Sequence, residues 1–156
     1  MRFTHLHLLL IFLFISPCLL SQSALKGEAQ RSFHLMFEDP SVAGRWMQKL
    51  SPEVVVSDAL LQAYRGAAVM AVARFERKIE AKRKGMIEGK HWVEKAVAAN
   101  TQDVDIRIVR YVLQSHLPAI AGYSQHRRED SLFIRKYLQQ IPASDRRDEI
   151  RRRLKW

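Results

Sequence analysis

Residues 51–75 read SPEVVVSDALLQAYRGAAVMAVARF, and this stretch decides the fold class. It opens with Ser51, Pro52 and Glu53, which place a capping hydroxyl, a first-turn proline and an acid at the positive end of a helix dipole. Apolar residues then recur three or four positions apart, at Val56, Leu60, Ala63, Tyr64, Ala67, Met70, Ala71 and Phe75. The pattern predicts one long helix. Because nearly every side of 66–73 is small or apolar, we expect this helix to be central and the most buried.

The surrounding sequence predicts more helices and no sheet. Residues 53–117 contain no proline, so 65 consecutive residues lack the residue that breaks helices. No Asn-Gly or Asp-Gly hairpin signal occurs, and apolar and polar residues do not alternate over any sustained length. The predicted fold class is all-α, with six to seven antiparallel helices in a bundle.

Turn and cap signals place the other helices. We expect them at about 25–37, 41–50, 79–99, 126–140 and from Ser144 onward, and one capped by Thr101 or Asp103 that ends near 116. Gly85 and Gly89 lie four residues apart, so they share a helix face that a neighbouring backbone can approach closely. We interpret this pair as packing within the chain, not as a dimerisation signal.

The amino terminus is typical of a secretory signal peptide. Arg2 precedes an uninterrupted apolar run over 8–15, and small residues at Ser21 and Ser23 precede the first lysine. The apolar segment is shorter than the roughly 20 residues that span a bilayer, so we expect cleavage near Ser21 to Ser23 and no transmembrane segment afterwards. The chain is therefore expected to be secreted or periplasmic.

This leader sets the domain organisation. We expect a signal peptide over 1–23, a helical domain over 24–142 and a basic carboxyl-terminal helix over 143–156 that frays. The last helix is expected to fray because its apolar content is only Ile150, Leu154 and Trp156.

Cys18 is the only cysteine and lies inside the leader. The run Ser16-Pro17-Cys18 partly resembles a lipoprotein cleavage box, although Pro17 stands where a small residue is required, so lipidation of Cys18 stays an open alternative. Cleavage after Ser21 or Ser23 would remove the only thiol. The mature chain would then have neither a disulfide nor a cysteine nucleophile.

Two resemblances follow from short motifs. Gly89, Val93 and Ala96, followed by the polar turn 100–103 and a new helix, resemble the second half of a tetratricopeptide repeat, which implies a close antiparallel helix pair. Thr101 stands where that repeat has proline. The bundle is therefore expected to be tetratricopeptide-like or irregular.

A longer resemblance covers about 60–135. This region is similar to a family of small exported bacterial proteins that have no established activity, and the match implies a helical fold and an envelope location. The residues that carry it are Ala63 to Ala67, Gly89, Glu94 to Val97, Ile106, Arg107, Arg110, Tyr111, Gln114, Leu117, Pro118, Gly122, Tyr123 and Asp130.

One group of polar residues could bind a ligand. Arg107, Arg110 and Gln114 are three and four residues apart and share one helix face, so two guanidinium groups could bind a carboxylate or phosphate. The alternative, which we favour, is pairing with acids of the domain itself, such as Asp130, Glu94 or Asp105.

Tyr64 completes this candidate set. Its hydroxyl could turn toward the same arginines, but we favour an ordinary core role for it. A small-ligand receptor or enzyme would be built from Tyr64, Arg107, Arg110, Gln114 and Asp130.

Catalytic and metal signatures are not found in the sequence. It has no His-Glu-x-x-His, Gly-x-Ser-x-Gly, phosphate-binding glycine loop or dinucleotide fingerprint. The histidines after the leader are His34, His91, His116 and His126. No two of them are three or four residues apart. We therefore expect no catalytic residues, no metal site and no cofactor.

The formal charge of +10 is the remaining feature. Residues 74–95 hold eight basic and four acidic side chains, and residues 145–155 hold six and three. The charges of both signs are interleaved and do not form basic blocks, which argues against nucleic acid. The leading hypothesis is a non-enzymatic exported binding or scaffold module for a protein partner. The alternative is a basic adaptor for anionic surfaces such as lipid headgroups or polysaccharide.

Overall fold

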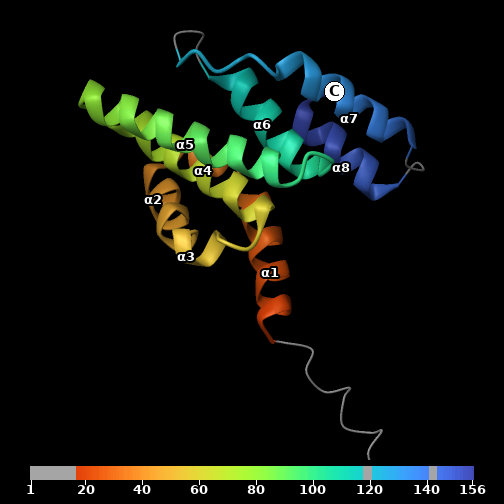
Figure 1. Ribbon diagram of the computed structural model, residues 1–156, viewed down its shortest axis with the longest axis horizontal. Helices are drawn as coiled ribbons and strands as arrows, with labels where there is room; N and C mark the ends of the chain where they lie inside the picture. The colour runs from red at the N-terminus through yellow and green to blue at the C-terminus, as the bar shows by residue number, and fades with distance from the viewer. Residues whose placement is uncertain (1–16, 118–120, 141–143) are drawn as a thin grey trace, which may run out of the picture.

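The computed structural model describes residues 17–117, 121–140 and 144–156, and within these ranges the chain is helical with no strand (Figure 1). The all-α prediction is confirmed. Most of the expected leader, residues 1–16, lies outside the described residues. The elements are α1 (Pro17–Ser32), the 3-10 helix η1 (Leu35–Phe37), α2 (Pro40–Lys49), α3 (Pro52–Val55), α4 (Ala59–Phe75), α5 (Ile79–Ala99), α6 (Val104–His116), α7 (Arg127–Gln140) and α8 (Asp145–Leu154).

The antiparallel pair α4 and α5 forms the centre of the molecule (Figure 1). The two backbones meet at glycines, because a Cβ added to Gly66 would lie 2.6 Å from the carbonyl oxygen of Gly89. Gly85 faces Ala73 on α4 in the same way. The interpretation of Gly85 and Gly89 as packing residues is therefore confirmed. Both pack against α4, so the close approach is between α4 and α5.

The long helix expected over 51–75 is in fact two helices. The chain leaves α3 after Val55 and starts α4 at Ala59, and the Asp58 carboxylate accepts a hydrogen bond of 3.0 Å from the Leu61 backbone N–H. Asp58 is therefore the cap of the central helix. Val56, expected on the apolar stripe, is 67% exposed. Because the apolar run Val54 to Val56 continues the helical spacing, the sequence pattern did not reveal the break between α3 and α4.

Elements α1, η1 and α2 cover one side of α4. The Phe33 ring packs edge-on against the Tyr64 ring, with 5.8 Å between centroids. The helix expected over 25–37 is split, since α1 ends at Ser32 and η1 follows it. Arg65 of α4 donates a 2.6 Å hydrogen bond to the carbonyl oxygen of Leu50, which ties the end of α2 to the central helix.

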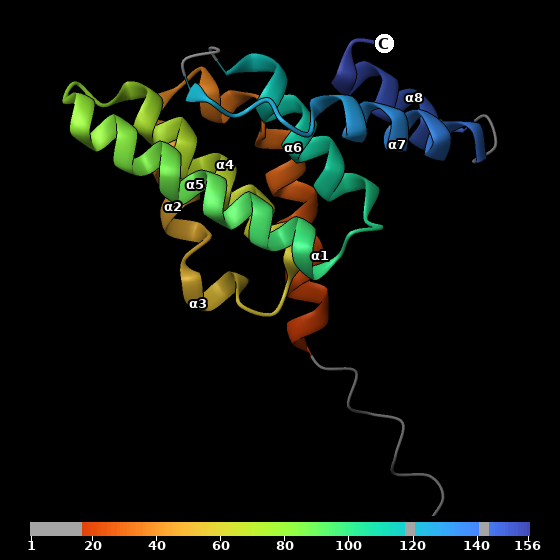
Figure 2. The same cartoon turned by 45° about the horizontal axis from the view of Figure 1, so that its top comes forward.

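Helices α6, α7 and α8 share a second, smaller core. Its buried members are Val104, Ile108, Ile134, Leu138, Ile150 and Leu154. Ile150 of α8 is fully buried in this core, and the expected fraying of the last helix stays a prediction. Apolar content alone did not reveal that polar contacts also hold α8. Turning the molecule by 45° keeps α7 and α8 at one end and the α4–α5 connection at the other (Figures 1 and 2).

Candidate functional site

Arg107 and Arg110 lie on α6, and a local cap fixes where this helix begins. The Asp103 side chain accepts hydrogen bonds from the backbone N–H groups of Asp105 and Ile106, at 2.8 and 3.2 Å. Of the two caps that the sequence left open, Asp103 is therefore the one used. The helix then turns Ile106 toward the main core and Arg107 and Arg110 toward α7.

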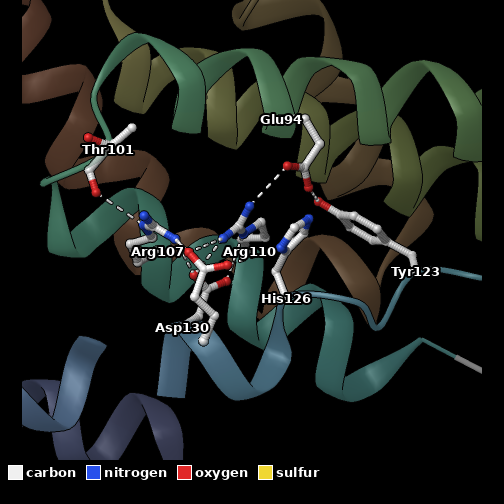
Figure 3. A network of polar contacts seen from close by, with 8 residues as sticks. Glu94, Thr101, Arg107, Arg110, Tyr123, His126 and Asp130 are labelled. Atoms are coloured by element: carbon white, nitrogen blue, oxygen red, sulfur yellow. Dashed lines mark hydrogen bonds and ion pairs between the residues drawn. The ribbon is translucent and has the colours of Figure 1, made fainter. Parts of the chain in front are cut away.

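Arg110 and Asp130 form the centre of a buried ion network (Figure 3). Arg110 Nε lies 2.7 Å from Asp130 Oδ2, and Arg110 Nη2 lies 2.7 Å from Asp130 Oδ1, which is a bidentate pair. Arg107 Nη1 also donates to Asp130, at 2.9 Å. Asp130 is fully buried and Arg110 is 2% exposed, so solvent screens this pair little.

Two glutamates extend the network from both sides. Glu94 of α5 accepts from Arg110 Nη1 at 2.9 Å and from the Tyr123 hydroxyl at 2.7 Å (Figure 3). Glu129 of α7 accepts from Arg107 Nη1 at 2.5 Å. Arg107 Nε donates to the Thr101 carbonyl oxygen. The network therefore links α5, α6 and α7 with the two segments that connect them, through Thr101 and Tyr123.

The network also shifts the acid–base behaviour of its members. Hydrogen bonding from Arg107 holds the pKa of Glu129 below its usual range. Burial alone would lower the pKa of Arg110, but its hydrogen bonds and charge pairing with Asp130 and Glu94 raise it. Burial, and then the hydrogen bond to Glu94, raise the pKa of Tyr123. A charged Arg110 and a neutral Tyr123 are thus the stable forms at neutral pH.

The structure brings three of the five candidate residues together. Arg107, Arg110 and Asp130 are in contact, as the favoured pairing alternative predicts. Gln114 is buried one turn further along α6, and its side-chain amide has no hydrogen-bond partner among the described residues. Each guanidinium is occupied by acids of the chain itself, so this geometry joins helices and presents no open ligand site.

Tyr64 does not face Arg107 or Arg110. Its hydroxyl lies 3.4 Å from Arg153 Nη2 of α8, and burial raises the pKa of Tyr64 to about 12. The idea that Tyr64 turns toward the α6 arginines is therefore wrong. Its side chain is fully buried, as the core interpretation expects.

Asp105 belongs to a second network that sequence reasoning missed. It accepts from Arg146 at 2.5 Å and from Arg153 at 3.1 Å, and these contacts fasten α8 to α6. Arg146 also pairs with Glu149 one turn along, at 3.0 Å. The pairs span 41 and 48 residues, so only alternating acids and arginines in 145–153 could have hinted at them.

The part of the chain that the structure describes contains no cluster of three or more His, Cys, Asp or Glu side chains able to hold a metal ion. His126 contacts Glu129 at 3.1 Å, and His116 contacts the Val112 carbonyl oxygen at 2.9 Å. These two histidines thus have local partners. In the same described ranges, no helix has both the length and the apolar character needed to cross a bilayer.

An exposed surface of mixed apolar and charged side chains lies at the far end of the α4–α5 pair, residues 74–87, which we call the hairpin end. Every residue from Arg74 to Glu80 is exposed. Phe75 and Ile79, expected on apolar stripes, are 37% and 72% exposed, and Ile87 is 57% exposed. An open depression between the hairpin end and α2 is lined by Pro40, Gly44, Val72, Phe75, Glu76, Arg77 and Lys78.

The hairpin end was visible in the sequence only as a charged stretch. Residues 74–84 contain six basic and two acidic side chains. In the described chain, the only ion pair among them joins Arg83 and Glu80, at 3.4 Å. Helical spacing assigned Phe75 and Ile79 to the core, and the structure corrects this because both side chains are exposed where α4 ends and α5 begins.

Comparisons with protein-family models, curated proteins and solved structures found no match. The two resemblances of the sequence analysis therefore stay predictions, and the function has to be argued from the chain's own geometry.

Proposed function

We propose that this chain is an exported, non-enzymatic helical module that binds an anionic surface through the hairpin end. The single observation that supports this most strongly is the composition of residues 74–84, where basic side chains outnumber acidic ones by four on an exposed turn. Export is proposed on the leader of residues 1–23. Its direct test is the amino-terminal residue of the product recovered from the cell.

The buried networks support a binding role over a catalytic one. The charged groups best suited to chemistry, Arg107, Arg110 and Asp130, are paired with one another and buried. Such pairs fix how helices dock, because removing one partner leaves an uncompensated buried charge. The proposal therefore places function on the outer surface of the bundle.

The cations of the hairpin end are available to a partner. Arg77, Lys78, Lys82 and Lys84 make no ion pair with any residue in the described ranges. Each lysine or arginine close to an anionic surface contributes about 1 kcal/mol at low ionic strength. Four or more together give binding that is measurable and weakens with salt.

The test uses heparin, a sulfated polysaccharide, as the probe. Neutralising the free cations in R77Q/K78Q/K82Q/K84Q is expected to abolish salt-dependent retention. The matched control R127Q/R128Q/K136Q/R151Q removes the same charge from exposed positions of α7 and α8. The control is expected to elute close to the wild-type protein.

Equal loss in both variants would show that net charge alone drives binding and would contradict a local site. No binding by the wild-type protein at low salt would overturn the proposal. In that case the protein-partner hypothesis would be the stronger one, and its test is a pull-down from envelope extract.

A further inference from the structure

We propose that the anionic surface is a lipid bilayer and that Ile79 and Phe75 enter its interfacial region. This inference rests on the proposed function of the hairpin end, and it goes further by naming the partner. The observation behind it is the exposure of apolar side chains among the cations. Ile79 is 72% and Phe75 37% exposed, and both lie within a stretch, 74–84, that holds six basic side chains.

The turn of the hairpin end, residues 74–80, is exposed at every position. Gly85 of α5 contacts Ala73 of α4, and the eleven residues 74–84 connect these two positions. In both views this end lies away from α7 and α8 (Figures 1 and 2). A flat surface can therefore approach the turn without contacting those helices.

The first turns of α5 form an apolar and cationic stripe. Ile79, Arg83 and Ile87 are four residues apart, so they lie along one face of the helix. Lys82 and Lys84 flank that face on both sides. Long basic side chains of this kind keep their charged ends at headgroup level while apolar neighbours enter the interface.

A bilayer explains the exposed isoleucines better than a soluble polyanion does. Charge alone is enough to hold a sulfated polymer, and apolar side chains add nothing to that contact. At a membrane, binding strength grows with buried apolar area as well as with electrostatic attraction. Ile79 is the residue whose contribution separates the two partners.

The first measurement locates the turn directly. The variant Ile79→Trp is mixed with vesicles of equimolar phosphatidylglycerol and phosphatidylcholine that carry brominated acyl chains, which quench tryptophan. We expect quenching well above the wild-type background from Trp46, Trp92 and Trp156, and loss of this quenching in vesicles of phosphatidylcholine alone. The control Leu132→Trp places the probe at a comparably exposed apolar position of α7 and is expected to show none.

This readout is local, so it applies to the protein as the cell yields it, with or without the leader. Quenching at position 132 equal to that at position 79 would overturn the inference. Quenching at position 79 that persists undiminished in phosphatidylcholine vesicles would also overturn it, because the anionic lipid would then be dispensable.

The second measurement compares affinities. Ile79→Ser is expected to weaken binding to the anionic vesicles about tenfold, as expected for removing most of one inserted apolar side chain. Its heparin affinity should stay at the wild-type value, and Leu132→Ser should change neither. Vesicle binding by Ile79→Ser as tight as wild type overturns the bilayer inference.

The two proposals fail in different ways. Heparin binding without vesicle binding overturns the bilayer and leaves the anionic-surface function in place. If the wild-type protein binds neither heparin nor the anionic vesicles, both proposals are overturned.

Discussion

Arg110 and Asp130 form a bidentate ion pair with two contacts of 2.7 Å, and both side chains are buried between α6 and α7. Such a pair is a poor ligand site because its donors are already used. It is a strong determinant of helix docking, since the energetic cost of breaking it is the cost of an unpaired buried charge.

Asp130→Asn is therefore expected to lower the free energy of unfolding by about 3–5 kcal/mol. The amide keeps the shape of the carboxylate but removes the buried negative charge. Arg110 and Arg107 are then left with the more exposed carboxylates of Glu94 and Glu129 alone. Urea denaturation measures the loss. Glu129→Gln is the control, because the Glu129 side chain is 56% exposed and its loss is expected to cost under about 1 kcal/mol. Equal effects of the two variants would contradict the assigned roles.

Gly89→Ala is expected to destabilise the fold by about 3 kcal/mol or to prevent folding. Its added methyl would lie 2.6 Å from the Gly66 carbonyl oxygen and would force α4 and α5 apart. Gly44→Ala on α2 is the matched control, since no atom lies within 4 Å of its added Cβ. The control is expected to be neutral or stabilising by about 0.5–1 kcal/mol. A tolerated Gly89→Ala would show that the helices do not meet at this seam.

Two buried tyrosines predict how stability depends on high pH. Burial raises the pKa of Tyr64 to about 12 and also raises the pKa of Tyr123, so the folded protein holds both phenolic protons more tightly than the unfolded chain. Their contribution is fully present below the unfolded pKa of about 10 and is lost as pH rises above it. The free energy of unfolding should therefore fall above pH of about 10, and less steeply in Y64F/Y123F.

Absorbance at 295 nm provides the direct check, because phenolate absorbs there. Of the four tyrosines, Tyr64 and Tyr123 should ionise only as the protein unfolds, because burial raises the pKa of both. Ionisation of all four in one step while the far-ultraviolet circular dichroism stays native would contradict the burial of these hydroxyls.

Removal of the proposed leader is expected to leave the bundle intact. Within the proposed leader, the Gln22 amide donates one exposed hydrogen bond of 3.4 Å to the Ser57 hydroxyl. The stronger contacts lie further along the chain, where Lys26 pairs with Asp58 at 2.9 Å and the side chains of Ala29 and Phe33 are buried. A chain that begins at residue 24 should unfold at nearly the same urea concentration as the full chain. A chain that begins after Phe33 should be destabilised by about 3 kcal/mol or more, through loss of the aromatic packing on Tyr64. Equal loss in both truncations would contradict the proposed boundary.

Local signals in the sequence were enough to predict much of the fold. The helix expected over 79–99 has these bounds in α5, and Asp103 caps α6 as one of the two expected residues. Helix caps, prolines and apolar spacing act over a few residues and can be recognised without a structure. The break before Ala59 carried such a signal, the cap residue Asp58, but the valines before it continued the helical pattern.

Contacts between residues far apart in the sequence were harder to predict. The pairing of Arg107 and Arg110 with Asp130 was among the expected alternatives, whereas Tyr64 and Asp105 turn to α8, whose position no local pattern predicts. The exposure of Ile79 depends on where α4 stops covering α5. The helix α4 ends at Phe75, and apolar spacing along α5 alone cannot locate that end.

Hydroxyl-radical footprinting with anionic vesicles tests the central claim most directly, because it reports the solvent exposure of individual side chains. The account predicts that vesicles protect Phe75, Ile79 and Ile87 from oxidation and leave Leu132 unchanged. Protection centred on Leu132, or unchanged oxidation of Phe75 and Ile79 while the protein is bound, would contradict it.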